Sequence, residues 1–286
     1  MMLEEKVVED VRRALDEDLG SGDISAELIE EPSLACALVV TREPAVLCGV
    51  SWFEEVFRQL PGEVKVEWRH QDGDRLEADV QVCMLSGPAR ALLTGERTAL
   101  NFLQTLSGTA TLAARYVSAL EQSHTVLLDT RKTIPGLRRA QKYAVRCGGG
   151  QNHRMGLYDE ILIKENHILA CGGISQAIAR ARDIHGPRVP VEVEVEGLDE
   201  LAEALSGGAD KVLLDNFGQD LMVQAVILRD QRRPEVRLEV SGGVGLSDIR
   251  EIAKTGVDYV SVGALTKDLQ AVDLSMRFYS GWDTVP

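Results

Sequence analysis

The pattern of hydrophobic and polar positions changes character near the middle of the chain. An acidic amphipathic segment at the N-terminus is followed by apolar runs with strand-like alternation at residues 35–50, 64–69 and 78–85. Residues 96–122 have helical periodicity and are interpreted as a helix that links two halves. We therefore predict that the first half is an α+β unit built on an antiparallel sheet.

After this helix, short β-branched runs alternate with helical segments. The runs lie at residues 125–130, 160–164, 189–196, 211–216, 237–243 and 259–264. Repeated strand–helix units predict a parallel sheet. Because six units fall short of the eight of a complete barrel, we expect an incomplete α/β barrel; an open doubly wound sheet is the alternative. No Gly-x-Gly-x-x-Gly follows a strand, which disfavours the dinucleotide-binding form of that alternative.

Charge narrows the classes of partner. The formal net charge is −14, which argues against bulk attraction to nucleic acid or to an anionic membrane, and no apolar run is long enough for a membrane span. Residues 131–164 nevertheless hold eight basic residues against Asp159 and Glu160. This cationic segment predicts a pocket for a small, multiply charged anion; a basic patch on solvated helices is the alternative.

The cysteines indicate a reducing compartment. The five cysteines are odd in number and scattered, and none forms a Cys-x-x-Cys pair. The N-terminal segment carries glutamates where a signal peptide needs lysines. We therefore expect a cytoplasmic protein.

The predicted strands end in polar residues that a core does not need. They are Asp129 to Lys132, Lys164, Glu194, Asp215, Ser241 and Gly263. In a barrel these ends meet at one mouth, where active sites lie. Each also has a structural interpretation: Glu194 on a solvated face with Glu192 and Glu196, Asp215 as a turn or helix cap, and Lys164 as an edge residue.

Glycines near the last two predicted strands indicate phosphate binding. Ser241-Gly242-Gly243 leaves a strand and enters a helix predicted to begin near Ser247, and Gly263-Ala264 follows the final strand. Glycines permit close backbone approach, and barrels commonly bind phosphate at these loops. The carboxylates Glu194 and Asp215 are suited to hold Mg²⁺ between the protein and substrate phosphates. The segment 147–154 is glycine-rich and ends in His153 and Arg154, which suit a carboxylate.

Six ordered segments together resemble the quinolinate phosphoribosyltransferase family of NAD biosynthesis. They are residues 129–138, 146–167, 191–194, 213–217, 239–244 and 261–266, and residues 96–104 extend the resemblance over essentially the whole chain. The resemblance implies an N-terminal α/β sandwich domain at 1–115, a seven-stranded incomplete α/β barrel at 116–270, and a C-terminal segment, 271–286, that returns to the first domain. It also implies a homodimer with shared active sites, and it raises the expected number of barrel strands from six to seven.

The resemblance further implies a reaction and a set of roles. Quinolinate and phosphoribosyl pyrophosphate would give nicotinate mononucleotide, pyrophosphate and CO₂, with Mg²⁺ and no organic cofactor. The quinolinate carboxylates would be held by Arg131, His153, Arg154 and Lys164, with Arg97 supplied by the partner subunit. Lys132 would lie between the substrates, Glu194 and Asp215 would bind the ribose and Mg²⁺, and Ser241, Gly242, Gly243, Gly263 and Ala264 would bind the 5-phosphate. By this resemblance Lys132, Lys164, Glu194 and Asp215 form the catalytic group.

The sequence departs from the family pattern at two places. Lys267-Asp268 stands where His-Ser is expected, and Glu165 follows Lys164 where Asp is usual. Three other functions stay open: a molybdate-transport-associated relative acting on another base, a barrel lyase that uses Lys164 as a Schiff-base nucleophile, and a non-catalytic binder of a phosphorylated anion.

Overall fold

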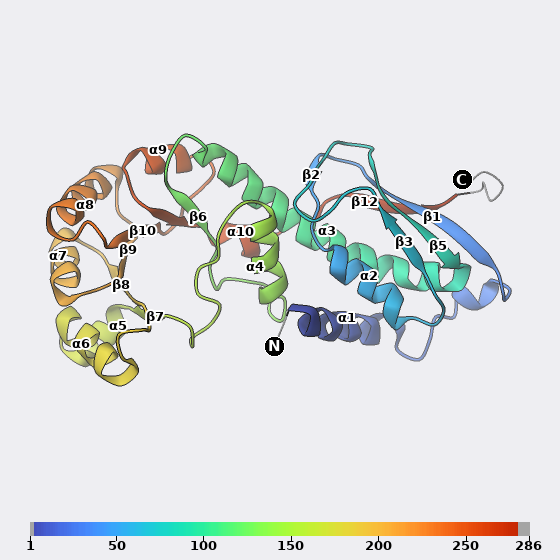
Figure 1. Cartoon of the computed structure of the whole chain (residues 1–286), viewed down its shortest axis with the longest axis horizontal. Coiled ribbons are helices and arrows are strands. Elements are labelled where there is room, and N and C mark those ends of the chain that lie inside the picture. Colours follow the sequence, from blue (N-terminus) through green and yellow to red (C-terminus); the bar gives the residue numbers. More distant parts are fainter. Residues whose placement is uncertain (1–2, 280–286) are drawn as a thin grey trace. The chain divides into compact units, whose positions relative to one another are not determined.

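The computed structural model describes residues 3–279, which form two compact α/β units. The first unit contains the residues up to Ala114, Thr133–Gly149 and the residues from Thr266 on, and the second contains Arg115–Lys132 and Gly150–Leu265. The chain passes between the units more than once, and the long helix α3, Ala89–Leu120, begins in the first and ends in the second (Figure 1).

The first unit is built on an antiparallel sheet, as the alternation predicts. Its strand order is β12-β1-β5-β3. The bounds are Leu34–Thr41 for β1, Lys65–Trp68 for β3, Gln81–Pro88 for β5 and Leu274–Phe278 for β12. A small two-stranded sheet pairs β2, Ala45–Val46, with β4, Arg75–Leu76. Alternate residues of β1 are buried, so one face of the main sheet meets the core.

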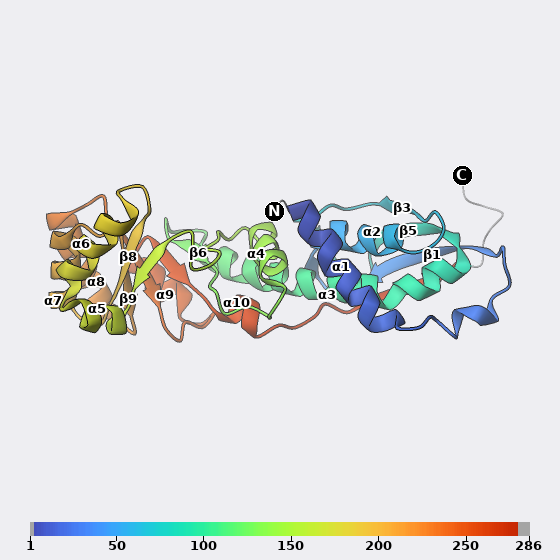
Figure 2. The ribbon, with the colours of Figure 1, turned by 90° about the horizontal axis from the view of Figure 1, so that it is seen from below.

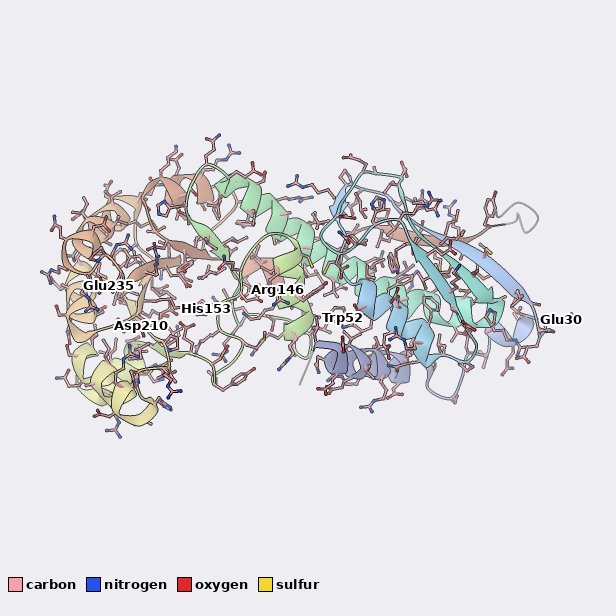
Figure 3. All side chains as sticks on the ribbon, viewed as in Figure 1. Glu30, Trp52, Arg146, His153, Asp210 and Glu235 are labelled. Atoms are coloured by element: carbon pink, nitrogen blue, oxygen red, sulfur yellow. The ribbon has the colours of Figure 1, made fainter. Side chains whose placement is uncertain are left out.

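Helices cover that face. They are α1, Leu3–Leu19, α2, Val50–Gln59, the first part of α3, and α4, Arg138–Cys147, with a short 3₁₀ turn at Ala26–Leu28 (Figures 1 and 2). Trp52 of α2, labelled in Figure 3, is fully buried, and so is Phe53. Phe53 packs edge-on against Phe57 and Trp68, with ring centroids 5.3 and 5.2 Å apart. The core of this unit is therefore aromatic and aliphatic.

Two elements here differ from the sequence prediction. The helix α2 was not expected, and α3 begins at Ala89 instead of residue 96. Gly95 lies inside α3, where a Cβ would come within 2.6 Å of the Phe57 ring. The glycine thus permits α2 and α3 to pack closely.

The second unit contains one parallel sheet of order β6-β11-β10-β9-β8-β7. The strands are Val126–Leu128, Ile161–Ile163, Val191–Val195, Lys211–Asp215, Arg237–Ser241 and Tyr259–Ser261, from β6 to β11. Each falls within one of the six predicted runs, and every pairing between them is parallel. The prediction of a parallel sheet is confirmed.

Helices form an arc on the outer side of this sheet (Figure 1). They are α5, Glu165–Cys171, α6, Ile174–His185, α7, Leu198–Gly207, α8, Gln219–Arg232, and α9, Ile249–Lys254. The short α10, Ala264–Lys267, follows β11. A doubly wound sheet needs helices on both faces, whereas here one face is left as an interior. The unit is an incomplete α/β barrel.

The seventh strand implied by the resemblance is reduced to a single residue. Within residues 3–279 the sheet has six strands, and Gln151 alone forms a parallel bridge with Leu128 on the free side of β6. Its N–H donates to the Leu127 carbonyl at 2.9 Å, and its carbonyl accepts from Asp129 at 3.2 Å. Three glycines precede Gln151, and glycine weakens a strand, so the pairing stops after one residue.

The two units divide the chain differently from the expected domains at 1–115 and 116–270. Thr133–Gly149 and the residues from Thr266 on belong to the first unit. Thr133–Gly149 belongs to the first unit because it contains α4, whose Ala140 and Ala144 are fully buried in the core of that unit. The C-terminal residues belong to the first unit because β12 pairs with β1, with Phe278 opposite Ala37 and Leu274 opposite Thr41. Of the expected C-terminal segment 271–286, residues 280–286 lie outside the described residues.

None of the helices described over residues 3–279 has both the length and the apolar character needed to cross a lipid bilayer.

Candidate active site

Four strand ends place polar side chains at one mouth of the barrel. Lys164 directly follows β7, Glu194 lies near the end of β8, and Asp215 and Ser241 are the last residues of β9 and β10. The alternation of β8 explains the arrangement, because Val191, Val193 and Val195 are fully buried on the other face. The charged side chains at the carboxyl end of the sheet therefore lie on its inner side.

A cavity of about 350 Å³ opens at this mouth. It is lined by Thr130, Arg131, Lys132, His153, Arg154, Leu162, Lys164, Glu194, Leu213, Glu239, Ser241 and Ser261. Seven of the predicted site residues are thus brought to one cavity. Four of these seven are Lys or Arg, which suits an anionic ligand.

Lys164 and Glu194 form an ion pair across the cavity between their Nζ and Oε2 atoms. The Lys164 side chain is 46% exposed and that of Glu194 is 20% exposed, so both stay accessible to a ligand. Lys164 also precedes α5, and its N–H donates to His167 Nδ1 at 3.0 Å. A short local hydrogen bond therefore fixes the backbone from which the lysine extends.

Asp215 and Ser241 lie side by side in the β9–β10 register. The Asn216 side chain donates from Nδ2 to Asp215 Oδ2 at 2.9 Å, and Asn216 itself has a positive φ of 54°. Gly242 has a φ of 101°, and a Cβ there would lie 2.4 Å from Asn216 Oδ1. Only glycine fits this turn without displacement, because both the backbone angle and the space exclude a side chain.

The predicted phosphate loops are present with one difference. The helix after Gly243 begins at Ile249 and not near Ser247, because Asp248 Oδ2 accepts the Gly245 N–H at 3.1 Å and closes a turn first. At the last strand, a Cβ on Gly263 would lie 3.1 Å from Lys132 Cδ. Gly263 thus lets Lys132 cross closely over the backbone.

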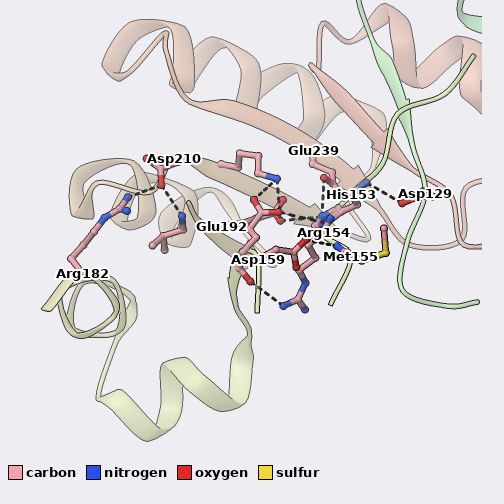
Figure 4. A network of polar contacts seen from close by, with 12 residues as sticks. Asp129, His153, Arg154, Met155, Asp159, Arg182, Glu192, Asp210 and Glu239 are labelled. Atoms are coloured by element: carbon pink, nitrogen blue, oxygen red, sulfur yellow. Dashed lines mark hydrogen bonds and ion pairs between the residues drawn. The ribbon is translucent and has the colours of Figure 1, made fainter. Parts of the chain in front are cut away.

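A buried charged network lies beneath the mouth (Figure 4). Nε2 of His153 lies 3.1 Å from Glu192 Oε2 and 3.3 Å from Glu239 Oε2, and both glutamates are fully buried. Asp129 is also fully buried, and its Oδ1 accepts the backbone N–H of His153 at 2.9 Å. Its Oδ2 accepts a second hydrogen bond from the Asn152 side chain. These contacts hold the loop that follows the three glycines.

The charge state of His153 depends on these neighbours. Burial alone lowers the pKa of His153, but the hydrogen bonds and charges of Glu192 and Glu239 outweigh it and raise the pKa to about 10. Nδ1 accepts the Arg154 N–H at 2.7 Å, which describes the Nε2-protonated tautomer. If Nδ1 also binds a proton, it can no longer accept the backbone N–H of Arg154. It can then donate toward Glu160 Oε2, which lies 3.7 Å away.

The network continues to the opposite end of the barrel. Lys211 pairs with Glu160 at 2.5 Å and lies 3.7 Å from Glu192. A second cavity of about 580 Å³ opens there, and it shares His153 and Arg154 with the first. Ligand atoms of His153, Glu160 and Glu192 come within 4.8 Å of one another, as in a metal site, but Lys211 occupies the position of the cation.

Several predicted residues have a different setting from the one expected. His153 was expected to hold a substrate carboxylate, and its Nε2 instead faces two buried glutamates on the cavity floor. Arg154 donates from Nη1 to the Glu160 carbonyl at 3.4 Å. Arg97 is an exposed residue of α3 in the first unit. Lys267, at the family departure, pairs with the neighbouring Asp268 at 3.2 Å.

The cationic segment divides between the two units. Arg131, Lys132, Arg154 and Lys164 line the cavity of the second unit, whereas Arg138, Arg139, Lys142 and Arg146 lie on α4 in the first. Lys142 is fully buried. Half of the segment therefore belongs to the predicted anion pocket.

Sequence reasoning missed Glu239 and the interior position of Glu192. Each lies two residues before a predicted site residue, Ser241 or Glu194, and so points to the same side of its strand. That spacing is the signal that would have found them. The solvated-face interpretation of Glu192 is wrong, because its side chain is 0% exposed.

Comparison with known proteins agrees with this geometry. The family description "Quinolinate phosphoribosyl transferase, C-terminal domain" matches residues 109–277, and the corresponding N-terminal domain matches residues 23–107. The nicotinate-nucleotide pyrophosphorylase [carboxylating] of Mycobacterium leprae is 42% identical over 270 residues, covering 93% of this chain and 95% of its own. The probable enzyme of the same name from Bacillus subtilis is 41% identical over 260 residues, covering 91% and 89%.

A solved structure extends the similarity to three dimensions. The nicotinate-nucleotide pyrophosphorylase from Francisella tularensis is 46% identical and covers 98% of each chain, with a TM-score of 0.92. Both domain matches, the similar sequences and the shared architecture lead to the same conclusion. The chain belongs to the quinolinate phosphoribosyltransferase family.

Proposed function

We propose that this chain transfers the phosphoribosyl group of phosphoribosyl pyrophosphate to the ring nitrogen of quinolinate. The products are nicotinate mononucleotide, pyrophosphate and CO₂, which places the reaction in NAD biosynthesis. The observation that carries the proposal is the mouth cavity, where four cationic side chains and the carboxylate of Glu194 meet. Both substrates are anions, and membership of the family supports the assignment.

The cations have separate tasks. Arg131, Arg154 and Lys164 hold the two carboxylates of quinolinate, and Lys132 lies between the substrates, close to the backbone of Gly263. Ser241, Gly242 and Gly243, with Gly263 and Ala264, form the phosphate site, where glycines permit close backbone contact. His153 acts from the floor of the cavity, where it supports the segment that carries Arg154.

The acidic residues supply the metal site of this proposal. Glu194 and Asp215 are oxygen donors on adjacent strands at the mouth, which is the ligand type that Mg²⁺ prefers. When bound, Mg²⁺ would neutralise the charge of the pyrophosphate leaving group. The Glu194 and Asp215 carboxylates themselves stabilise the positive charge that develops on the ribose carbon.

Decarboxylation follows from the substrate's own chemistry. Attack by the ring nitrogen leaves that nitrogen positively charged, so it accepts the electron pair released when the neighbouring carboxylate departs as CO₂. Arg131 and Lys164 keep the two carboxylates oriented during this step. Lys164 forms an ion pair with Glu194 at the mouth, and such an electrostatic contact suits the binding of an anionic substrate.

The direct test is to incubate the protein with quinolinate, phosphoribosyl pyrophosphate and Mg²⁺. We expect nicotinate mononucleotide and CO₂ in equal amounts, and little product when nicotinate replaces quinolinate. Loss of one carboxylate leaves cations at the site unpaired, at a cost on the order of 2–5 kcal/mol. Product from nicotinate, or a borohydride-trapped adduct on Lys164, would contradict the proposal.

A homodimer with shared sites is part of the proposal, with Arg97 reaching the mouth of the partner subunit. Arg97 is exposed on α3, as such a role requires. The test mixes inactive Arg97→Ala chains with inactive Lys164→Ala chains under conditions of subunit exchange. In a mixed dimer one site receives both defects and the other site is intact. Random pairing makes about half of the dimers mixed, so about a quarter of the wild-type activity returns. No recovery after demonstrated exchange would rule out the shared site.

We also propose a cytoplasmic location. All five cysteines are free, which fits a reducing compartment. Fractionation of cells that produce the tagged protein tests this directly, and recovery from an exported fraction would contradict it.

A further inference from the structure

Two cysteines far apart in the sequence meet in the first unit. Cys48 lies in the segment before α2, and Cys147 is the last residue of α4. Their sulfur atoms and a carboxylate oxygen of Asp72 all lie within 4.8 Å of one another. Neither cysteine has a part in the proposed reaction.

The surroundings of the two thiols differ. Cys48 is fully buried, and Ser107 fixes its backbone by accepting its N–H at 2.9 Å and donating to its carbonyl at 3.2 Å. Cys147 is half-buried and is followed by three glycines. The inner thiol is therefore held in place, while the outer one can be reached by a small molecule and can adjust.

The nearby groups favour a thiolate at Cys147 and a protonated thiol at Cys48. Burial raises the pKa of Cys48 well above its usual range. The hydrogen bond from the Cys48 thiol lowers the pKa of Cys147, and Tyr143 and Arg146 add to this effect. Together they outweigh burial and the charge of Asp72, which raise it. The Arg146 guanidinium, labelled in Figure 3, lies 5.7 Å from the centroid of the Tyr143 ring on the same helix, α4.

The contacts of Asp72 argue against a metal at this position. Its Oδ1 accepts the N–H groups of Gly49 and Val50 at 2.8 and 3.1 Å, and its Oδ2 accepts the Tyr143 hydroxyl at 2.8 Å. Both carboxylate oxygens are engaged in holding the turn before α2. The cluster thus offers two sulfur atoms to each other.

We propose that Cys147 and Cys48 form a thiol–disulfide pair that hydrogen peroxide oxidises. The Cys147 thiolate attacks a peroxide oxygen, so that an S–O bond forms, the O–O bond breaks and hydroxide leaves. The Cys48 sulfur then attacks the resulting sulfenic acid, an S–S bond forms, and the Cys48 proton leaves with the hydroxyl group as water. The peroxide gains two electrons and the two thiols lose them.

Closing the pair needs only local movement. The sulfur atoms have to approach from within 4.8 Å to about 2.05 Å. Rotation of the Cys147 side chain and adjustment at the end of α4 can supply this, since Gly149 already has a positive φ of 89°. The disulfide tethers the start of the segment that leads to His153 and Arg154.

The test treats the reduced, full-length protein with hydrogen peroxide, blocks free thiols with iodoacetamide and maps the peptides by mass spectrometry. We expect one cross-linked peptide pair, Cys48 with Cys147, formed at least tenfold faster than any oxidation of Cys36 or Cys171 and reversed by dithiothreitol. Because the readout is the cross-link, it is independent of the proposed enzymatic activity. Cys147 that reaches sulfinic acid without cross-linking would overturn the proposal.

Two variants separate the roles of the thiols. Cys48→Ser should leave a sulfenic acid on Cys147 that dimedone labels, whereas Cys147→Ser should leave Cys48 unlabelled because it is buried. Cys171→Ser is the matched control and should cross-link as the wild type does. Dimedone labelling of Cys48 in the Cys147→Ser chain, or one bound Zn²⁺ per chain that protects both cysteines from iodoacetamide, would overturn the assignment.

Discussion

The first unit of this protein has a mainly apolar interior, whereas the second holds a charged network inside its sheet. The first packs its helices on the sheet through Trp52, Phe53 and other apolar residues. In the second, apolar residues face the outer helices, and the inside of the sheet holds Glu192, Glu239 and His153. The first interior thus mainly stabilises the fold, whereas the second also supports the candidate site.

The difference teaches where a barrel can accept charge. Buried parallel strands are usually apolar on both faces, whereas β8 and β10 carry the buried glutamates Glu192 and Glu239 on their inner face. Charges placed there must still be compensated, because an unpaired buried charge is costly. His153 and Lys211 provide the compensation.

The largest effect on the free energy of unfolding is expected in the apolar interior. Phe53→Ala should destabilise the first unit by about 3–5 kcal/mol, since Phe53 is fully buried and its loss leaves a cavity. Urea unfolding followed by tryptophan fluorescence measures this, because Trp52 and Trp68 both lie in the first unit. The control Leu28→Ala, at a residue that is 85% exposed, should change stability by less than about 0.5 kcal/mol.

The next effect tests compensation in the charged interior. His153→Leu removes the cation between Glu192 and Glu239 and should cost the second unit about 3 kcal/mol. Hydrogen exchange at the amides of β8 and β10 reports on that unit. A loss below about 1 kcal/mol would show that the two glutamates do not need the imidazole.

A smaller change is expected from pH. Because the folded pKa of His153 is raised to about 10 from 6.5, its contribution to stability is complete below pH 6.5 and is lost as pH rises toward 10. We expect a loss of about 2 kcal/mol over this range, less than the full shift implies, because the protonated ring gives up the Arg154 N–H. The groups facing the ring are Glu160, Glu192 and Glu239, with Lys211 beyond them.

The control for the pH profile is the His153→Leu chain, which should lose this slope. A wild-type profile as flat as that of the variant would show that His153 stays neutral in the folded protein.

The smallest effect on stability is expected at the mouth. Glu194→Gln should change the free energy of unfolding by less than about 0.5 kcal/mol, because the side chain lies at the open end of the barrel. Turnover should nevertheless fall by more than about tenfold, as for Asp215→Asn, if both residues act on the ribose and the metal. Unchanged turnover in either variant would remove that residue from its proposed role.

Much of the second unit could be predicted from the sequence, because its signals are local. Each strand is a short apolar run, and Lys164, Asp215 and Ser241 stand at strand ends where the parallel arrangement brings them together. In the first unit the local signal was weaker. The helix α2 was missed because it begins at Val50, where the run interpreted as a strand, residues 35–50, ends, and α3 begins at Ala89, before the predicted start at residue 96.

By itself, the sequence determined most of the elements, the parallel sheet and the residues at its carboxyl end, since hydrophobic periodicity and strand ends are properties of neighbouring residues. Tertiary structure decided which face of β8 is interior, that α4 with its buried Lys142 belongs to the first unit, and that His153 meets Glu192 and Glu239. Alternation with a period of two is the same for either face of a strand, so only the packing of distant segments can distinguish inside from outside.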